Sequence, residues 1–181
     1  MSTADPRRTR PASLELTWHP ARPAPSAPVV VTGVFDVLHV GHVRFLAAAR
    51  EQGAALAVGV EDDPRVRAWK GPGRPVHPAT ERAEVLAALR CVDATFLISG
   101  DPTLTSWEHY VELLRPLAPA VLAFTEGDPH AAPKRRAAAV LGATAVELPL
   151  TEGRSTTAAL NRLGDGRAGS LDDVAVPQTS R

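Results

Sequence analysis

The chain has little cysteine, little lysine, no excess of either charge and no long apolar run. Cys91 is the single cysteine among 181 residues, so an internal disulfide is excluded and we interpret this side chain as a structural thiol. Lys plus Arg and Asp plus Glu number 20 each, and a net charge of zero gives no general attraction to nucleic acid or membranes. No apolar stretch approaches bilayer-spanning length, and the first residues lack a signal-peptide core. We therefore expect a soluble cytoplasmic protein without a nucleic-acid or membrane partner.

The two ends of the chain differ in composition from its centre. Residues 1–28 contain six prolines and four arginines with little hydrophobic periodicity, which predicts a flexible extension. Within it, residues 14–18 alternate apolar and polar side chains, which is also compatible with an edge strand or a partner contact. Residues 164–181 are rich in Gly, Asp and Ser and predict a flexible tail. The domain itself is expected to span residues 29–163.

Apolar runs alternate with amphipathic segments through this central region. The runs predict strands at residues 29–34, 55–60, 94–98, 120–124 and 145–148. The helical patterns lie at residues 41–52, 78–90, 103–114, 130–141 and 156–163. Asp101 followed by Pro102 is typical of a helix cap and first helical position. This alternation favours an α/β fold with a Rossmann-like, doubly wound sheet of five parallel strands, which binds ligands beyond its C-terminal strand ends.

The most informative motif is GVFDVLHVGH at residues 33–42, between the first predicted strand and the first predicted helix. Backbone N–H groups at a helix N-terminus attract anions, and His39 and His42 on the same turn can donate hydrogen bonds to one anion. Gly41 between them removes a side chain where a phosphate has to approach closely. The motif therefore predicts a phosphate site.

This motif resembles the GxFDxxHxGH signature of the cytidylyltransferase-like nucleotidyltransferases. The resemblance extends over about residues 29–163 and implies the Rossmann-like fold of that family. It implies that His39 and His42 act in catalysis. It also implies that Gly33, Phe35, Asp36 and Gly41 bind the nucleotide.

A second block, KGPGRP at residues 70–75, joins the second strand to the next helix. A Gly- and Pro-rich loop with one Lys and one Arg can fold over a polyphosphate. The block resembles a loop of heptose-phosphate adenylyltransferases, and the likeness continues as an ERxxxLxxLxxVD pattern at residues 81–93. The resemblance implies catalytic roles for Lys70 and Arg82, with Arg82 holding phosphate, and a substrate contact for Arg74.

Two acidic positions near this block have both a ligand-binding and a capping interpretation. Asp62 and Asp63 follow the second strand, where they can bind Mg²⁺ through water, orient an acceptor hydroxyl, or cap a helix before Pro64. Asp63 is the substrate-binding candidate because it matches the family's strand-end aspartate. Asp93 is a candidate for substrate binding and, alternatively, for capping the turn into the third strand.

The third block is TEGRSTT at residues 151–157, which resembles the family's EGxSTT motif. Hydroxyls at a helix start can cap the backbone or donate to phosphate oxygens, so Ser155 and Thr156 are predicted to bind the nucleotide.

One segment departs from the heptose-phosphate pattern, which usually has a lysine followed by Gly-Gly-Asp-Tyr. The chain has TEGDP at residues 125–129, so Gly127 and Asp128 remain as nucleotide-binding candidates and Glu126 adds a negative charge. The basic cluster at residues 134–136 can compensate this charge, but a solvated helix face is the favoured interpretation. Leu150 replaces an arginine that glycerol-phosphate cytidylyltransferases usually carry, which weakens a CTP interpretation.

Together these features predict transfer of a nucleoside monophosphate from a nucleoside triphosphate, ATP in the leading hypothesis, to a sugar 1-phosphate. Heptose 1-phosphate is the leading acceptor, and pyrophosphate is the second product. Mg²⁺ is the expected cofactor, and we predict no residue of the protein as a metal ligand. The family resemblance also implies a homodimer. The alternatives are a glycerol-3-phosphate cytidylyltransferase, an FAD-synthetase-like enzyme and a non-catalytic nucleotide-binding regulatory module.

Overall fold

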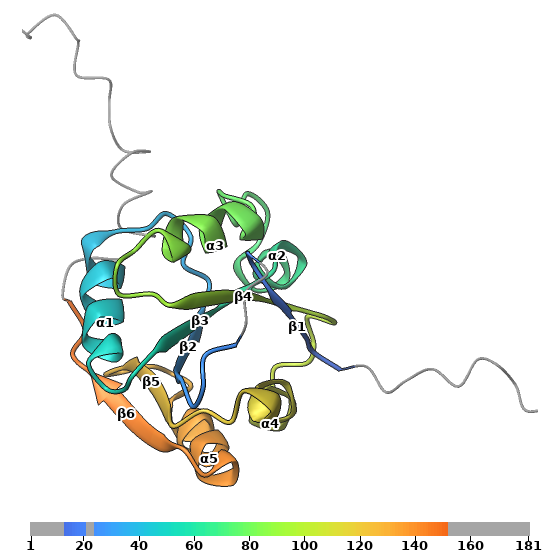
Figure 1. Ribbon diagram of the computed structural model, residues 1–181. Helices are drawn as coiled ribbons and strands as arrows, with labels where there is room; N and C mark the ends of the chain where they lie inside the picture. Colours follow the sequence, from blue (N-terminus) through green and yellow to red (C-terminus); the bar gives the residue numbers. More distant parts are fainter. Residues whose placement is uncertain (1–12, 21–23, 152–181) are drawn as a thin grey trace, which may run out of the picture.

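The computed structural model describes residues 13–20 and 24–151, which form one sheet covered by helices on both faces (Figure 1). The strand order is β1-β4-β3-β2-β5-β6, and every neighbouring pair is parallel except β1 with β4. The strands are β1 (Glu15–Trp18), β2 (Val29–Gly33), β3 (Leu56–Glu61), β4 (Ala94–Ser99), β5 (Val121–Thr125) and β6 (Thr144–Leu148). The predicted α/β, doubly wound class is confirmed.

The helices divide between the two faces of the sheet. They are α1 (Val40–Arg50), α2 (Asp63–Lys70), α3 (Ala79–Ala87), α4 (Trp107–Leu114), the 3₁₀ turn η1 (Arg115–Leu117) and α5 (Ala131–Leu141). Figure 1 shows α1 and α3 on one side of the sheet and α4 and α5 on the other. Strand residues alternate accordingly: Val29 and Val31 pack with α1 and α3, whereas Val30 packs with α4 and α5.

The sheet has one strand more than predicted, because part of the expected flexible extension is β1. Its register pairs Glu15 with Ser99 and Trp18 with Phe96, and the two aromatic rings meet edge to face at 5.4 Å. Leu14 is buried in the same cluster of side chains. The alternating pattern at residues 14–18 was thus the correct signal, and its proline-rich surroundings favoured the wrong interpretation.

Two helices differ from the predicted pattern. The helix expected from residue 103 begins at Trp107, because Asp101 accepts hydrogen bonds from the backbone and hydroxyl of Thr103 and forms a separate turn. The additional helix α2 is capped by Asp62, whose side chain accepts from the backbone N–H of Arg65. The helix predicted at residues 156–163 lies outside the described residues.

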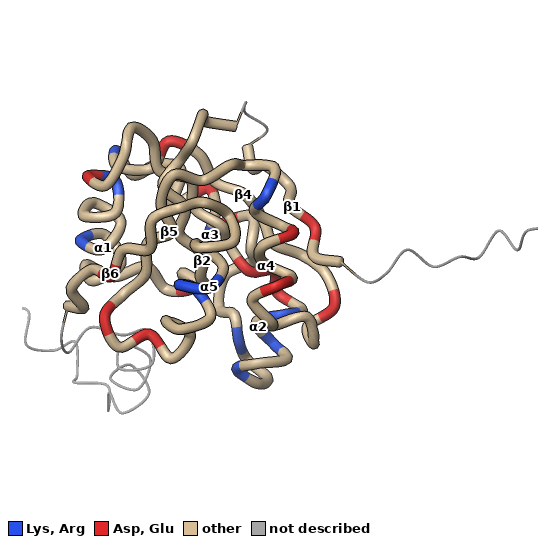
Figure 2. The backbone as a smooth tube through the Cα atoms, turned by 90° about the horizontal axis from the view of Figure 1, so that it is seen from below, with Lys and Arg blue, Asp and Glu red and all other residues tan. Residues whose placement is uncertain are grey.

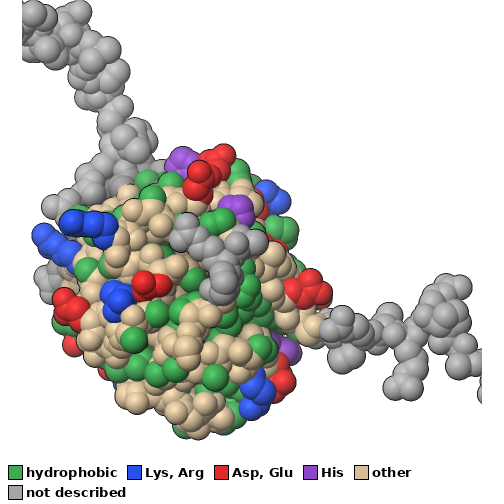
Figure 3. All heavy atoms as spheres, viewed as in Figure 1, with side chains coloured by type: hydrophobic (Ala, Val, Ile, Leu, Met, Phe, Trp, Pro, Cys, Tyr) green, Lys and Arg blue, Asp and Glu red, His purple; other side chains and the backbone are tan. Residues whose placement is uncertain are grey.

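The order of the strands reverses next to β2, which pairs with β3 on one side and with β5 on the other. The connection after β2 leads to α1 on one face of the sheet, and the connection after β5 leads to α5 on the other face. A crevice therefore opens beyond the C-terminal ends of these two strands. Acidic and basic side chains are interspersed on the face shown in Figure 3, while Figure 2 shows several Lys and Arg positions along α2. Among the described residues, no helix is both long and apolar enough to cross a bilayer.

Candidate active site

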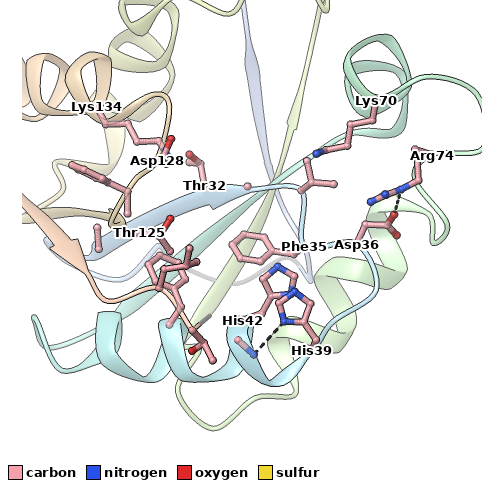
Figure 4. Close-up of a pocket in the computed structure, with 18 residues that line it drawn as sticks. Thr32, Phe35, Asp36, His39, His42, Lys70, Arg74, Thr125, Asp128 and Lys134 are labelled. Carbon is pink, nitrogen blue, oxygen red and sulfur yellow. Dashed lines mark hydrogen bonds and ion pairs between the residues drawn. The ribbon is translucent and has the colours of Figure 1, made fainter. Parts of the chain in front are cut away.

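A cavity of about 380 Å³ lies beyond the C-terminal ends of β2 and β5, where the fold predicts a ligand site. The sequence-predicted residues that line it come from the β2–α1 turn, the end of α2 and its following loop, and the turn after β5 (Figure 4). They are Gly33, Phe35, Asp36, His39, Gly41, His42, Lys70, Arg74 and Asp128. Folding therefore gathers most of the predicted site from three separate sequence blocks.

The first histidine of the motif begins helix α1. The extended backbone of His39 makes it the N-cap residue, and its Nδ1 accepts a hydrogen bond of 3.1 Å from the backbone N–H of Gly41. Because Nδ1 accepts, the neutral ring carries its proton on Nε2, which is thereby a donor. The motif thus fixes the tautomer of one histidine at the mouth of an anion-attracting helix end.

The second histidine is packed against the first. The rings of His39 and His42 stack with centroids 3.9 Å apart, and the ring of Phe35 meets His42 edge-on at 5.5 Å. Burial, and secondarily the charge of His39, lower the pKa of His42 to about 4. Its Nδ1 is buried without a hydrogen-bond partner among the described residues, and protonation would place a charged N–H there. His42 is therefore a neutral imidazole near pH 7.

The turn between β2 and α1 has an unusual backbone. Phe35 and Val37 adopt positive φ angles of 50° and 53°, which are uncommon for residues with side chains. The ring of Phe35 folds back over Gly33, where a Cβ atom would lie 3.1 Å from the ring. Gly33 therefore permits the close packing of Phe35 that supports His42.

Asp36 fastens the loop after α2 to this turn. Its buried carboxylate accepts hydrogen bonds from the backbone of Val76 and His77 and from Nε of Arg74, the last at 2.8 Å. Burial acts to raise the pKa of Asp36, but these hydrogen bonds and the Arg74 charge outweigh it and lower the pKa. The described contacts of Asp36 hold Arg74 beside the cavity. Asp36 also lines the cavity, and its contact with the nucleotide stays a prediction.

The cations of the cavity lie on opposite walls. Figure 4 shows Lys70 at the end of α2 and Lys134 on α5 pointing in from two sides, with Thr32 between them. Lys134 Nζ lies 2.6 Å from the Asp128 carboxylate, and the Lys134 side chain is 28% exposed. The favoured interpretation of residues 134–136 as a solvated helix face is thus wrong for Lys134. Sequence reasoning also missed the hydroxyls of Thr32 and Thr125 as site groups, although both line the cavity and Thr125 begins the TEGDP segment.

Arg82 does not face the cavity. Its guanidinium is buried and donates to the backbone carbonyls of His77, Val34 and Glu61. It also forms an ion pair of 2.7 Å with Asp63. The predicted phosphate contact is corrected: all three nitrogens of Arg82 bind the protein and tie α3 to the ends of β2 and β3.

The two acidic substrate candidates also have other partners. Asp63 pairs with Arg82 and does not line the cavity. Asp93 precedes β4, accepts from the backbone N–H of Leu56 and pairs with Arg50 at 2.8 Å. Because β3 and β4 begin there, Asp93 lies at the edge of the sheet opposite the cavity, and the capping interpretation replaces the substrate role.

The remaining predictions concern the turn after β5 and the last motif. Gly127 has a φ of 72° and shapes the turn without lining the cavity. Ser155 and Thr156 lie outside the described residues. Within residues 13–20 and 24–151, no group of three or more His, Cys, Asp or Glu side chains is arranged to hold a metal ion.

Comparison with solved structures supports the fold alone. The lipopolysaccharide core biosynthesis protein from Thermoplasma volcanium superposes with a TM-score of 0.55 at 22% identity, covering 72% of this chain and all of that one. Pantoate-beta-alanine ligase from Francisella tularensis gives a TM-score of 0.52 at 14% identity, covering 72% of this chain and 61% of that one. Both share the sheet that carries the cavity.

Sequence comparison identifies the family. The bifunctional protein HldE of Streptomyces coelicolor is 42% identical over 141 residues, which are 76% of this chain and 28% of that protein. FAD synthase of Pyrococcus abyssi is 47% identical over 95 residues, which are 52% of this chain and 60% of that one. The chain thus spans about a quarter of the HldE protein it matches. The profile of the family described as Cytidylyltransferase-like matches residues 30–137, more than half of the sequence, and the chain belongs to this family of nucleotidyltransferase enzymes.

Proposed function

We propose that the protein transfers a nucleoside monophosphate from a nucleoside triphosphate to a phosphorylated acceptor and releases pyrophosphate. The observation that carries this proposal is the stacked pair of His39 and His42 at the start of α1, facing the cavity at the strand switch point. An acceptor phosphate oxygen bonds to the α-phosphorus as the bond to the bridging oxygen breaks, and pyrophosphate leaves with that electron pair. Such a reaction depends mainly on positioning and on stabilisation of phosphate charge.

The protein supplies these two contributions with different groups. His39 donates from Nε2, while neutral His42 stacks behind it, so both rings contact phosphate oxygens without repelling each other by charge. Lys70 and Arg74 add positive charge from the opposite wall. Mg²⁺ is expected to be held mainly by triphosphate oxygens and water, the usual mode of this ion in phosphoryl transfer. Ser155 and Thr156 remain candidates for the β- and γ-phosphates.

ATP with heptose 1-phosphate is the leading substrate pair, because the loop at residues 70–75 and the block at residues 81–93 resemble that subfamily. The second candidate acceptor is FMN, favoured by the 47% identity to an FAD synthase. We also propose a homodimer, which sedimentation velocity tests directly.

The test is pyrophosphate release in the presence of Mg²⁺. ATP, CTP, GTP and UTP are each combined with heptose 1-phosphate, other sugar 1-phosphates, glycerol 3-phosphate and FMN. Release with ATP and one acceptor supports the proposal and names the acceptor. Nucleotide binding without release from any pair contradicts it and favours a regulatory module.

Replacing either histidine tests the role of the pair. His39→Ala or His42→Ala is expected to lower turnover on the order of 10²–10⁴-fold, the range for loss of a positioned donor to developing charge. Circular dichroism of each variant controls for folding. Turnover within threefold of the unsubstituted protein contradicts the assignment.

A further inference from the structure

A second, larger cavity of about 610 Å³ opens on the opposite face of the sheet, between β2, α2, α4 and α5. It is continuous with the first cavity, since both are lined by residues 32–34, Phe124, Asp128, Lys70 and Lys134. A volume of this size accommodates a small molecule. Two adjoining spaces that share one boundary can hold the two substrates of a transfer reaction side by side.

The boundary between the cavities is marked by the only two lysines of the chain. Lys70 and Lys134 line both spaces, whereas none of the arginines among the described residues lines the second cavity. Lysine carries a compact charge with three rotatable donors, which can serve two phosphates in turn. The backbone N–H of His130 and the amine of Lys134 both donate to Asp128, so the amine is held in place at this boundary.

Aromatic rings form part of the remaining wall of the second cavity, beside aliphatic side chains and the polar Thr105 and His130. Trp69, Trp107 and Tyr110 line it, while the Tyr110 hydroxyl is already engaged, donating to Glu61 and accepting from Arg65. Both oxygens of the buried Glu61 carboxylate are likewise used, by Tyr110 and by Arg65. Tyr110 and the two tryptophans therefore offer their ring faces to the cavity, and such faces pack against the apolar face of a ring.

Resting on the proposed function, we infer that this second cavity binds the acceptor, a phosphomonoester of a ring compound, and that Lys134 binds the acceptor phosphate. The triphosphate beside His39 and His42 leaves this adjoining space for the acceptor, whose phosphate has to approach another anion. At this boundary Lys70 and Lys134 stand against the single carboxylate of Asp128, and the excess of positive charge offsets the repulsion between the two anions. A sugar 1-phosphate and FMN share the required chemistry, a phosphomonoester on a molecule that contains a ring with an apolar face. The phosphate is bound to the ring in the sugar phosphate and to the ribityl chain in FMN.

The test compares Lys134→Met, which keeps the length of the stem and removes the charge, with Lys134→Arg. Arg135→Met is the matched control, because Arg135 is the next residue on α5 and lines neither cavity. Its guanidinium pairs with Glu147 and lies 5.9 Å from the ring centroid of Phe124. Calorimetric titrations of each protein use heptose 1-phosphate, FMN and magnesium ATP as separate ligands. Thermal melting of each variant verifies that it is folded.

We expect Lys134→Met to weaken binding of one phosphomonoester about 10- to 100-fold, the effect of losing a charged hydrogen bond. Lys134→Arg is expected to retain part of that affinity, and Arg135→Met all of it. Because Lys134 also lines the first cavity, we expect Lys134→Met to weaken magnesium ATP as well, but by a smaller factor than the phosphomonoester. The phosphomonoester that responds identifies the acceptor class. An equal loss of ATP affinity, or unchanged affinity for both phosphomonoesters, overturns the inference.

Binding and turnover separate this inference from the proposed function. Acceptor binding that depends on Lys134 without pyrophosphate release preserves the site and contradicts the proposed reaction. Pyrophosphate release that is insensitive to Lys134→Met preserves the reaction and contradicts the site. Trp107→Ala tests the aromatic wall, and we expect it to weaken the same phosphomonoester while leaving ATP binding unchanged.

Discussion

His42 connects the chemistry of the site to the stability of the protein. Its pKa is about 4 in the folded state against an ordinary value of 6.5, because of burial and the neighbouring His39. Between these two values the unfolded chain binds more protons at this position than the folded protein. The contribution of His42 therefore lowers the free energy of unfolding as pH falls from about 6.5 to about 4.

Urea denaturation at several pH values measures this effect. We expect His42→Gln to flatten the loss of stability between pH 6.5 and pH 4 relative to the unsubstituted protein. Comparing the two proteins cancels carboxylates that titrate equally in both. Identical slopes would show that His42 is protonated as readily in the fold as in the unfolded chain.

Arg82, which the sequence predicts to bind phosphate, is expected to contribute mainly to the stability of the fold. Its guanidinium donates to three carbonyls and pairs with Asp63, so its removal leaves several buried acceptors unsatisfied. We expect Arg82→Ala to destabilise the fold by about 3 kcal/mol or more. The exposed Arg90 on the same segment is the control, and Arg90→Ala should change stability by less than about 0.5 kcal/mol.

Chemical denaturation and substrate binding together decide between the two roles of Arg82. A folded Arg82→Ala protein with normal stability and lost phosphate binding would restore the role suggested by the resemblance. A destabilised protein that still binds nucleotide when folded agrees with the contacts in the structure.

The presence of strand β1 changes the stability that we expect for proteins truncated at the N-terminus. Sequence composition predicts that deleting residues 1–28 leaves the fold intact, but Leu14 is buried and Trp18 packs on Phe96. Deleting residues 1–20 is therefore expected to lower the melting temperature by several degrees, since burial of a large apolar side chain contributes about 1.5–3 kcal/mol. Deleting residues 1–12 removes none of these contacts and is the control. Equal melting temperatures for both truncations would show that β1 adds no stability.

Strand β3 depends on the absence of a side chain at its centre. A Cβ atom at Gly59 would lie 2.6 Å from the ring of Phe96 on β4, and both positions are in the core. We expect Gly59→Ala to destabilise the protein by about 1–3 kcal/mol through overpacking. Combining it with Phe96→Leu should recover part of the loss in denaturant titrations. Strictly additive effects would mean that the two positions do not interact.

Ligand binding is a property of the assembled sheet, because the cavity takes residues from α1, α2, β2 and β5. Magnesium ATP at about 100 times its dissociation constant is expected to stabilise the folded protein by about 2.7 kcal/mol. Differential scanning fluorimetry measures the shift in melting temperature, and His39→Ala should reduce it. No shift at millimolar nucleotide would contradict a triphosphate site.

Much of this architecture follows from patterns that neighbouring residues carry. The five parallel strands begin within one residue of their predicted positions, because an apolar run of suitable length needs burial on both faces. The position of the HxGH turn is also predicted from the sequence, because the motif lies between an apolar strand pattern and a helical pattern. His39 as the cap of α1 and the crevice beyond β2 both agree with these patterns.

The corrections concern residues whose role depends on distant partners. Arg82 is separated by 48 residues from Val34, to whose carbonyl it donates, and Asp93 by 37 residues from Leu56. Lys134 reads as part of a basic helix face until α5 is placed beside the end of β5, where its amine meets Asp128. The sequence pattern shows which side of a helix is polar or apolar. Which strand or helix packs against that side depends on the order of the strands in the sheet.

The amino-acid sequence was therefore sufficient for the fold class, the position of the HxGH turn and the family, because each depends on short-range periodicity or on one contiguous motif. The three-dimensional packing assigned Arg82 to the interior, turned residues 14–18 into a sixth strand and placed both lysines at the boundary between two cavities. Each of these outcomes depends on contacts between segments far apart in the chain. Their energies arise only when the sheet is complete, so no local pattern contains them.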